Sequence, residues 1–371
     1  MEREELAAWL RLATTPGVGN TAARRLLAAF GPPTELFAQP AAALEQVVTR
    51  AQAASLHAEP AQFQELLEAT ARWLQPDKRA ARRILTLGDS AYPPALLNIE
   101  DPPLMLYIMG SMDVAWPQAI AVVGSRNPTP QGLINARQFS RCFAQAGLTV
   151  VSGLALGVDA AAHEGALDAC EPGRPATIAV VGTGLDRVYP RQHLELAHRI
   201  AQAGFLVSEY PLGTPPLPPN FPRRNRIIAA LSRGTVVVEA ALKSGSLITA
   251  HQAAEQGKDV FAIPGSIHSP QSRGCHALLK QGAKLVETAQ DVLEELSVAH
   301  AVPPAAGLNE AAPADEDGIL AAMGFDPFSV DALVARTGIA AAHLQVKLLE
   351  LEMEGVLARL PGGLFQRVGA G

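Results

Sequence analysis

The chain has 371 residues, a formal net charge of −6 and 48% hydrophobic residues, which suits a folded protein of two or three domains. Because the overall charge is acidic, binding to nucleic acid would need a local basic surface. The three cysteines, Cys142, Cys170 and Cys275, lack metal-binding spacing, so we expect buried thiols in a reducing compartment and no metal or cofactor.

The amino-terminal section, residues 1–83, is predicted to be a helical domain. It starts with the charged "MEREELAAWL", which lacks a signal-peptide core, and no apolar run in the chain is long enough to span a membrane; we therefore expect a cytoplasmic protein. From about 5 to 75, apolar residues recur at three- and four-residue spacing, as in helices. "TTPGVGNTAARRLL" resembles a helix–hairpin–helix, and ten basic against nine acidic residues up to Arg83 leave packing, regulation and DNA contact open.

The central section, residues 84–298, alternates short β-rich runs with helical patterns. Examples are "AIAVVG" before "LINARQFSRCFAQAG", and "TVVVEA" before "LITAHQAAEQG". This alternation is sustained over more than six strands, which predicts an α/β fold with a doubly wound parallel sheet covered on both faces.

The carboxy-terminal section is predicted to be a linker and a small domain. Residues 299–314 are rich in Ala and Pro, as linkers are, and residues 315–371 show three helical patterns followed by two β-prone runs, the outline of a winged helix. The last of the three helical patterns, "AAAHLQVKLLELEMEG", carries Lys347 against three glutamates, and the domain has a net charge of −4. We therefore predict that it contacts protein or regulates a dimer, and hardly binds duplex DNA.

Four loops are predicted to meet at the carboxyl ends of the parallel strands, where ligands bind in such sheets. They are Gly124-Ser125-Arg126, "SGLALGVD" (152–159), "GTGLDRVYP" (182–190) and "KSGSLITA" (243–250). Taken singly, each loop can be ordinary turn chemistry. Asp159 is interpreted as a helix N-cap and His163 as a packed residue of an Ala-rich helix.

These loops do not match the usual nucleotide-binding motifs. "GTGLDR" places Arg187 where a dinucleotide site needs its third glycine, and "GVGNTA" (17–22) follows a helical pattern, not a strand. "LKSGS" lacks the glycine spacing of a P-loop.

A basic stretch, "NFPRRNRIIAALSRG" (220–234), is the strongest pointer to function. No acidic residue occurs between Pro211 and Val238, whereas a solvated helix face usually mixes both signs. Arginines on an anion-binding rim suit a row of phosphates, and bases could stack on nearby rings. The arginines are Arg223, Arg224, Arg226 and Arg233, and the rings are Tyr189, Tyr210 and Phe221. The alternative is that some of these arginines brace the fold by pairing with Glu209 or Glu239.

From about Gly88 to Glu295 the chain closely resembles the DNA-processing protein DprA (Smf) family. The blocks that carry the resemblance are "VVGSRNPT", "VVSGLALGVDAAAH", "GTGLDRVYP", "SEYPLGTPPLPPNFPRRNRIIAALS", "VVEAALKSGSLITAHQAAEQGKDVFAIPGS" and "GCHALLKQGAKLV". It implies an extended Rossmann-like core, a helical sterile-alpha-motif-like domain before it and a winged helix after it. It also implies a non-catalytic, dimeric protein that binds incoming single-stranded DNA without strong sequence preference during natural transformation, protects it and helps to load the recombinase RecA.

The resemblance and the rim loops together assign site residues. Those expected at the DNA are Gly124, Ser125, Arg126, Gly153, Arg187, Phe221, Arg223, Arg224, Asn225, Arg226, Lys243, Ser244, Gly245 and Ser246. Those expected at the dimer contact are Cys275, His276, Leu278 and Leu279.

Two other functions compete with this hypothesis. Nucleotide-hydrolysing phosphoribohydrolases (lysine decarboxylase-like) share this Rossmann variant, but "VVEAALKSGSLITA" lacks their double glycine, and Glu239 is displaced from the catalytic position. Release of free base from nucleoside monophosphates would favour the enzyme. A scaffolding protein, in contrast, would bind DNA equally well after exchange of Arg126 and Arg224 for alanine. The DNA-binding hypothesis predicts a large loss of affinity from both exchanges at little cost to stability.

Overall fold

The computed structural model describes residues 1–77, 80–111, 116–171, 173–298, 319–324, 327–360 and 362–368. The predicted linker at 299–314 lies outside these residues. Among the described helices none is both long and apolar enough to cross a bilayer.

The predicted amino-terminal helical section is present. Its helices are α1 (Arg3–Thr14), α2 (Asn20–Phe30), α3 (Pro33–Phe37), α4 (Ala41–Leu44), α5 (Arg50–His57) and α6 (Phe63–Trp73). Leu6, Trp9 and Leu10 are buried at the three- and four-residue spacing that puts side chains on one helix face. The stretch at 17–22 joins α1 to α2, as predicted, and Gly17 takes the positive φ of 78° that the turn needs.

The central section forms a nine-stranded sheet in the order β1-β2-β6-β5-β4-β3-β7-β8-β9. The strands are β1 (Arg82–Thr86), β2 (Met105–Gly110), β3 (Ala119–Val123), β4 (Thr149–Ser152), β5 (Thr177–Val180), β6 (Phe205–Ser208), β7 (Gly234–Val237), β8 (Asp259–Ala262) and β9 (Lys284–Leu285). Strands β3 to β9 pair in parallel, which confirms the predicted sheet. Strands β1 and β2 add an antiparallel edge, and β1 runs across the predicted boundary at residue 83.

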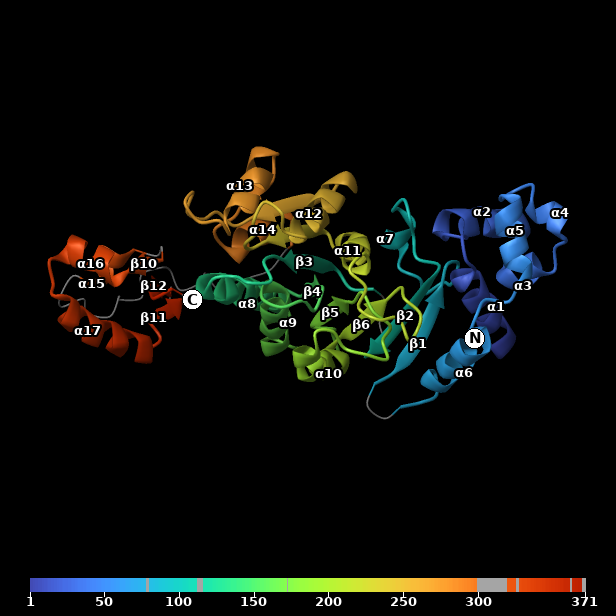
Figure 1. The fold of residues 1–371 in the computed structure, drawn as a ribbon, viewed down its shortest axis with the longest axis horizontal. Helices are drawn as coiled ribbons and strands as arrows, with labels where there is room; N and C mark the ends of the chain where they lie inside the picture. Colours follow the sequence, from blue (N-terminus) through green and yellow to red (C-terminus); the bar gives the residue numbers. More distant parts are fainter. Residues whose placement is uncertain are drawn as a thin grey trace.

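Helices cover both faces of this sheet (Figure 1). They are α7 (Pro94–Leu97), α8 (Pro130–Gln145), α9 (Val158–Asp168), α10 (Leu194–Ala203), α11 (Asn220–Leu231), α12 (Ser246–Glu255), α13 (Arg273–Lys280) and α14 (Ala289–Glu295), with a 3₁₀ turn at Arg191–His193. Helices α8 to α10 lie on one face and α11 to α13 on the other. In β3, Ile120 and Val122 pack with α8 and α9, whereas Ala121 and Val123 pack with α11 and α12. This alternation, with every residue of β3 buried, explains its uninterrupted apolar run.

The chain reverses its direction across the sheet between β3 and β7. Strands β4, β5 and β6 follow β3 on one side, and β7 then returns to pair on its other side. Loops after β3 and β7 therefore start helices on opposite faces of the sheet, and open α/β sheets bind ligands at such a switch point.

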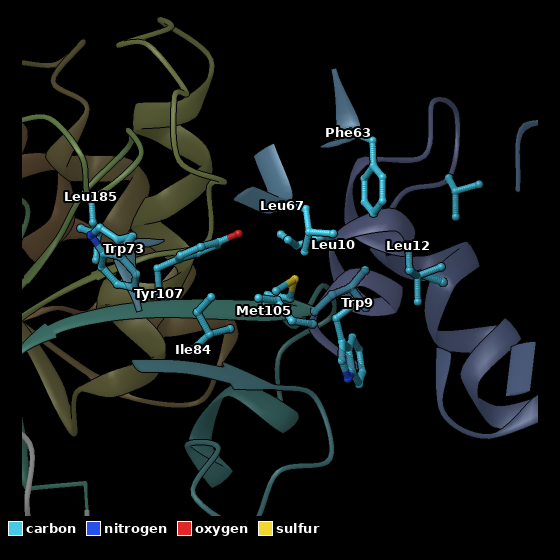
Figure 2. Packing of buried hydrophobic residues seen from close by; sticks show 14 of the residues in the cluster. Trp9, Leu10, Leu12, Phe63, Leu67, Trp73, Ile84, Met105, Tyr107 and Leu185 are labelled. Carbon is cyan, nitrogen blue, oxygen red and sulfur yellow. The ribbon is translucent and has the colours of Figure 1, made fainter. Parts of the chain in front are cut away.

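The amino-terminal helices share a hydrophobic core with the sheet. Figure 2 shows Trp9 and Leu10 of α1 beside Met105 of β2. Trp73, at the end of α6, meets Tyr107 of β2 edge-on, with ring centroids 6.0 Å apart. The helical section is thus a packed extension of the antiparallel edge.

The carboxy-terminal section has its own core and the predicted order of three helices and a hairpin. Its elements are α15 (Ile319–Met323), β10 (Phe328–Ser329), α16 (Val330–Thr337), α17 (Ala341–Met353), β11 (Leu357–Leu360) and β12 (Leu364–Arg367). Leu344, Leu348 and Leu351 of α17 are buried in this core with Phe328 and Phe365.

His163 of α9 is packed, as predicted, and its environment makes folding pH-dependent. The Thr177 hydroxyl donates to the Val150 carbonyl, so Nδ1 of His163, 2.7 Å away, donates to Thr177. Its Nε2 is buried and has no partner among the described residues. Burial lowers the pKa of His163 to about 3, with the positive charges of Arg224 and His193 acting in the same direction.

We expect stability to fall as the pH drops from about 6.5, because the unfolded chain binds the proton that the folded chain refuses. Between pH 6.5 and 5 this amounts to about 1.6 kcal/mol. Urea unfolding of the wild type and of His163→Gln at both pH values measures it. Between pH 6.5 and 5 the wild type should lose more stability than His163→Gln, because glutamine binds no proton. Equal losses in the two proteins would contradict this account.

Candidate nucleic-acid interface

The loop after β3 is held in a fixed shape by α9. The amide of Val158 donates to the carbonyl of Ser125 at 3.1 Å. Gly157 has a φ of 77°, and a Cβ on it would lie 2.5 Å from the same carbonyl oxygen. Glycine is therefore required at 157, and the first turn of α9 holds the loop Gly124-Ser125-Arg126 in place.

Glu239, just after β7, anchors the other end of this loop. Its carboxylate accepts the amide of Thr129 at 2.9 Å and the hydroxyl of Thr129 at 2.6 Å. The same hydroxyl accepts from the amide of Gly132 and so caps α8. Burial raises the pKa of Glu239, and the two bonds from Thr129 oppose this. Glu239 thus joins the two strands of the switch point.

Arg126, Phe221 and Tyr189 form what we call the cation–aromatic patch. The Arg126 guanidinium carbon lies 5.8 Å from the centroid of the Phe221 ring. The centroids of the Tyr189 and Phe221 rings lie 5.5 Å apart. The Phe221 ring packs over Gly182, where a Cβ would be only 3.2 Å from the ring. Arg126 and Tyr189 are exposed and Phe221 is half-buried, so the patch offers a charge and two ring surfaces to solvent.

Arg224, predicted to contact DNA, is buried instead, with 4% of its surface exposed. Its guanidinium donates to the carbonyls of Gly153 and Val180, at the ends of β4 and β5, and lies 3.9 Å from the Asp159 carboxylate. Burial lowers the pKa of Arg224 to about 10, and Asp159 opposes this shift. Arg224 therefore braces the strand ends. Gly153 is also buried, because Arg224 occupies the space where its side chain would be.

Asp159 is not the predicted N-cap. Gly157 holds that position, and Asp159 accepts instead from the amides of Gly153 at 3.1 Å and Ala155 at 3.3 Å. Burial raises its pKa, and Arg224 opposes this. The aspartate therefore shapes the loop after β4 and provides the countercharge for the buried arginine.

Arg226 is also buried and paired. It makes a two-pronged bond to Glu209, at 2.7 and 2.6 Å, and donates to the Asp101 carbonyl at 3.0 Å. Arg223 is exposed, but its guanidinium lies 3.3 Å from the Asp101 carboxylate. The alternative of fold-bracing arginines thus holds for Arg226, with Glu209 as the partner. Asp101, which precedes β2, carried no signal in the sequence.

The "KSGS" loop at the start of α12 joins the rim through Asn225. Its side-chain amide donates to the carbonyl of Gly245 at 3.2 Å and accepts from Arg224 at 3.0 Å. The hydroxyls of Ser244 and Ser246 lie 2.7 Å apart. Lys243 is exposed, and within the described part of the chain no carboxylate lies within ion-pair distance of it. The loop thus presents a cation at the carboxyl edge of the sheet, between β7 and α12.

The other predicted contacts differ in exposure. Arg187 is exposed but lies 3.0 Å from Asp186. Tyr210 is buried, with its hydroxyl 3.3 Å from the Asn220 carbonyl, so it offers no stacking surface. Of the three predicted rings, only Phe221 and Tyr189 are therefore placed to stack with bases.

At the predicted dimer contact, Cys275 and Leu278 belong to the core beneath α13. His276 and Leu279 are half-buried, and Nε2 of His276 lies 3.0 Å from the Gly265 carbonyl. Of these four residues, only His276 and Leu279 have side chains that reach the surface.

The geometry defines a class of protein: an extended Rossmann-like α/β protein with a topological switch point in its sheet and a winged helix after it. Comparison with known proteins gives the family. The DNA recombination-mediator protein A family model matches residues 83–297, and the DprA winged helix domain model matches 303–363. The chain therefore belongs to the DNA recombination-mediator protein A (DprA/Smf) family, which confirms the resemblance found in the sequence.

Relatives and solved structures agree with this assignment. The chain is 41% identical to protein Smf of Escherichia coli over 305 residues, 80% of each chain, and 47% identical to DprA of Streptococcus pneumoniae over 207 residues, 56% of this chain and 72% of that one. The X-ray structure of the S. pneumoniae protein superposes with a TM-score of 0.63 at 36% identity, covering 80% of this chain and 98% of that one. DprA of Helicobacter pylori, described for its single-stranded DNA binding mode, has a TM-score of 0.52 at 33% identity, covering 58% and 95%.

Proposed function

We propose that this protein binds single-stranded DNA through the cation–aromatic patch and the neighbouring Lys243, without strong sequence preference, and protects the bound strand. The observation that carries the proposal is the exposed Arg126 packed on the Phe221 ring, with Tyr189 beside it. The single-stranded DNA binding described for the H. pylori relative supports it.

The chemistry of the patch favours an unpaired strand. Bases of a single strand expose their faces and stack on aromatic rings, whereas bases of a duplex are already stacked on each other. The cations Arg126 and Lys243 would hold successive phosphates, and such contacts carry no sequence information. Arg224 and Arg226 support the rim from inside.

The biological role that we propose is to help load RecA on single-stranded DNA in the cytoplasm during natural transformation. The recombination-mediator family to which the chain belongs supports this role. We also propose a homodimer through the core around α13. His276 and Leu279 would contribute to it, and so would Leu285 on the edge strand β9, which is 54% exposed.

We propose binding without catalysis. Glu239 is the residue here that would have to act in a phosphoribohydrolase reaction. Both of its carboxylate oxygens accept hydrogen bonds from Thr129. A carboxylate so engaged holds the loop and is poorly placed to act as a base.

Binding to single-stranded and duplex oligonucleotides across a salt series tests the function. We expect at least roughly tenfold tighter binding of the single strand, with log K falling by about 0.7 per phosphate contact for each unit of log salt concentration. Fluorescence anisotropy with unrelated sequences of equal length also checks the lack of base preference. Equal or tighter duplex binding would refute the proposal.

A further inference from the structure

We propose that the exposed face of α17 is a docking site for a basic amphipathic α-helix of a protein partner. In a winged helix this position belongs to the helix that enters a DNA groove. Here the surface of that helix has the wrong charge for DNA and the wrong polarity for a solvated face.

The first observation is an apolar seam on the solvent side of α17. Val346, Leu349 and Met353 are 60%, 57% and 83% exposed, and Ala342, also exposed, precedes them. Their spacing of four, three and four residues is that of the a and d positions of a coiled coil. The residues that fill the domain core occupy the opposite face, so the exposed seam is not needed for folding.

The second observation is the charge along this seam. Glu350 and Glu354 flank it on one side and Glu352 on the other, and Lys347 pairs with Glu350 at 3.2 Å. Three glutamates therefore stand against one lysine. Phosphates of a duplex would meet a repulsive surface, and exposed apolar side chains of this size are unfavourable in water unless they are covered.

The charge also decides between possible protein occupants. Residues beside the a and d seam set partner choice through opposite charges. A second copy of α17 would place its glutamates opposite the glutamates of the first, and the two faces would repel each other. A helix with an apolar seam and flanking lysines or arginines satisfies both the apolar surface and the carboxylates, so this is the occupant to which we commit.

The test uses the full-length protein and a labelled synthetic helix of roughly three heptads, with Leu at a and d and Lys at e and g. Two control peptides have the same composition in scrambled order, or Glu in place of Lys. We expect the wild type to bind the basic helix and to bind both controls at least roughly tenfold more weakly, measured by fluorescence anisotropy.

Matched variants locate the site. Leu349→Asp should weaken peptide binding roughly tenfold or more, because it buries an unpaired charge in the seam. Ala335→Asp, an exposed position on α16, places the same side chain elsewhere in the domain and should have no effect. The double variant Glu350→Lys, Glu354→Lys should shift the preference to the acidic helix. Circular dichroism confirms that each variant is folded, and single-stranded DNA affinity should stay unchanged.

Several results would overturn the proposal. They are equal binding of the basic and control peptides, full binding by Leu349→Asp, loss of a dimer in Leu349→Asp by light scattering, and loss of duplex affinity in that variant. The third would assign the seam to a second copy, and the fourth to DNA.

Discussion

Replacing Arg126 with alanine is expected to weaken single-stranded DNA binding by about tenfold or more at physiological salt. The side chain is exposed, and among the described residues it contacts the Phe221 ring and no carboxylate, so its charge is available to a phosphate. Loss of one phosphate contact should also make the salt dependence shallower by about 0.7 in the log–log slope. Fluorescence anisotropy across a salt series measures both quantities.

A matched control removes the same charge elsewhere. Arg50 of α5 is 92% exposed and lies in the amino-terminal helical section, away from the sheet rim (Figure 1). Arg50→Ala should leave the DNA affinity and the salt slope unchanged. The free energy of unfolding of Arg126→Ala should lie within about 1 kcal/mol of the wild-type value, since this variant loses only an exposed cation–π contact. Identical binding by the two variants would show that Arg126 does not hold the DNA.

The sequence was sufficient to predict the parallel sheet and the loops at its rim. A strand buried on both faces must be apolar throughout, as β3 is, and the loop that follows it must lie at the carboxyl edge. The antiparallel strands β1 and β2 were missed because they precede the regular strand–helix alternation. Strand β1 pairs with β2, and β2 pairs with β6, which lies about a hundred residues further on in the chain, so no local pattern encodes this edge.

The arginines of α11 show where sequence reasoning ends. Arg223 and Arg226 are three residues apart and so lie on one helix face, but their exposure depends on carboxylates from distant elements. Asp101, which lies 125 residues before Arg226 in the chain, contacts both of them. Arg224 points to the ends of β4 and β5, 71 and 44 residues away. The absence of acidic residues within 211–238 indicated free charge, whereas the countercharges come from other parts of the fold.

Replacing Arg224 with alanine is expected to destabilise the protein by about 3–5 kcal/mol, which corrects the expectation of a small cost. The change leaves Asp159 buried without its countercharge, and it removes the guanidinium donor from two strand-end carbonyls. Urea unfolding followed by circular dichroism measures the loss. The exposed neighbour Arg223, changed to alanine, should cost no more than about 0.5 kcal/mol.

A double variant separates the buried pair from general damage. Arg224→Met combined with Asp159→Asn removes both charges, so it should be more stable than Arg224→Met alone, although the lost hydrogen bonds keep it below the wild type. Single-stranded DNA affinity, measured where each variant is folded, should change less than in Arg126→Ala, because Arg224 lies beneath the rim. A fully stable Arg224→Ala protein that no longer binds DNA would place the guanidinium on the surface and contradict its role as a brace.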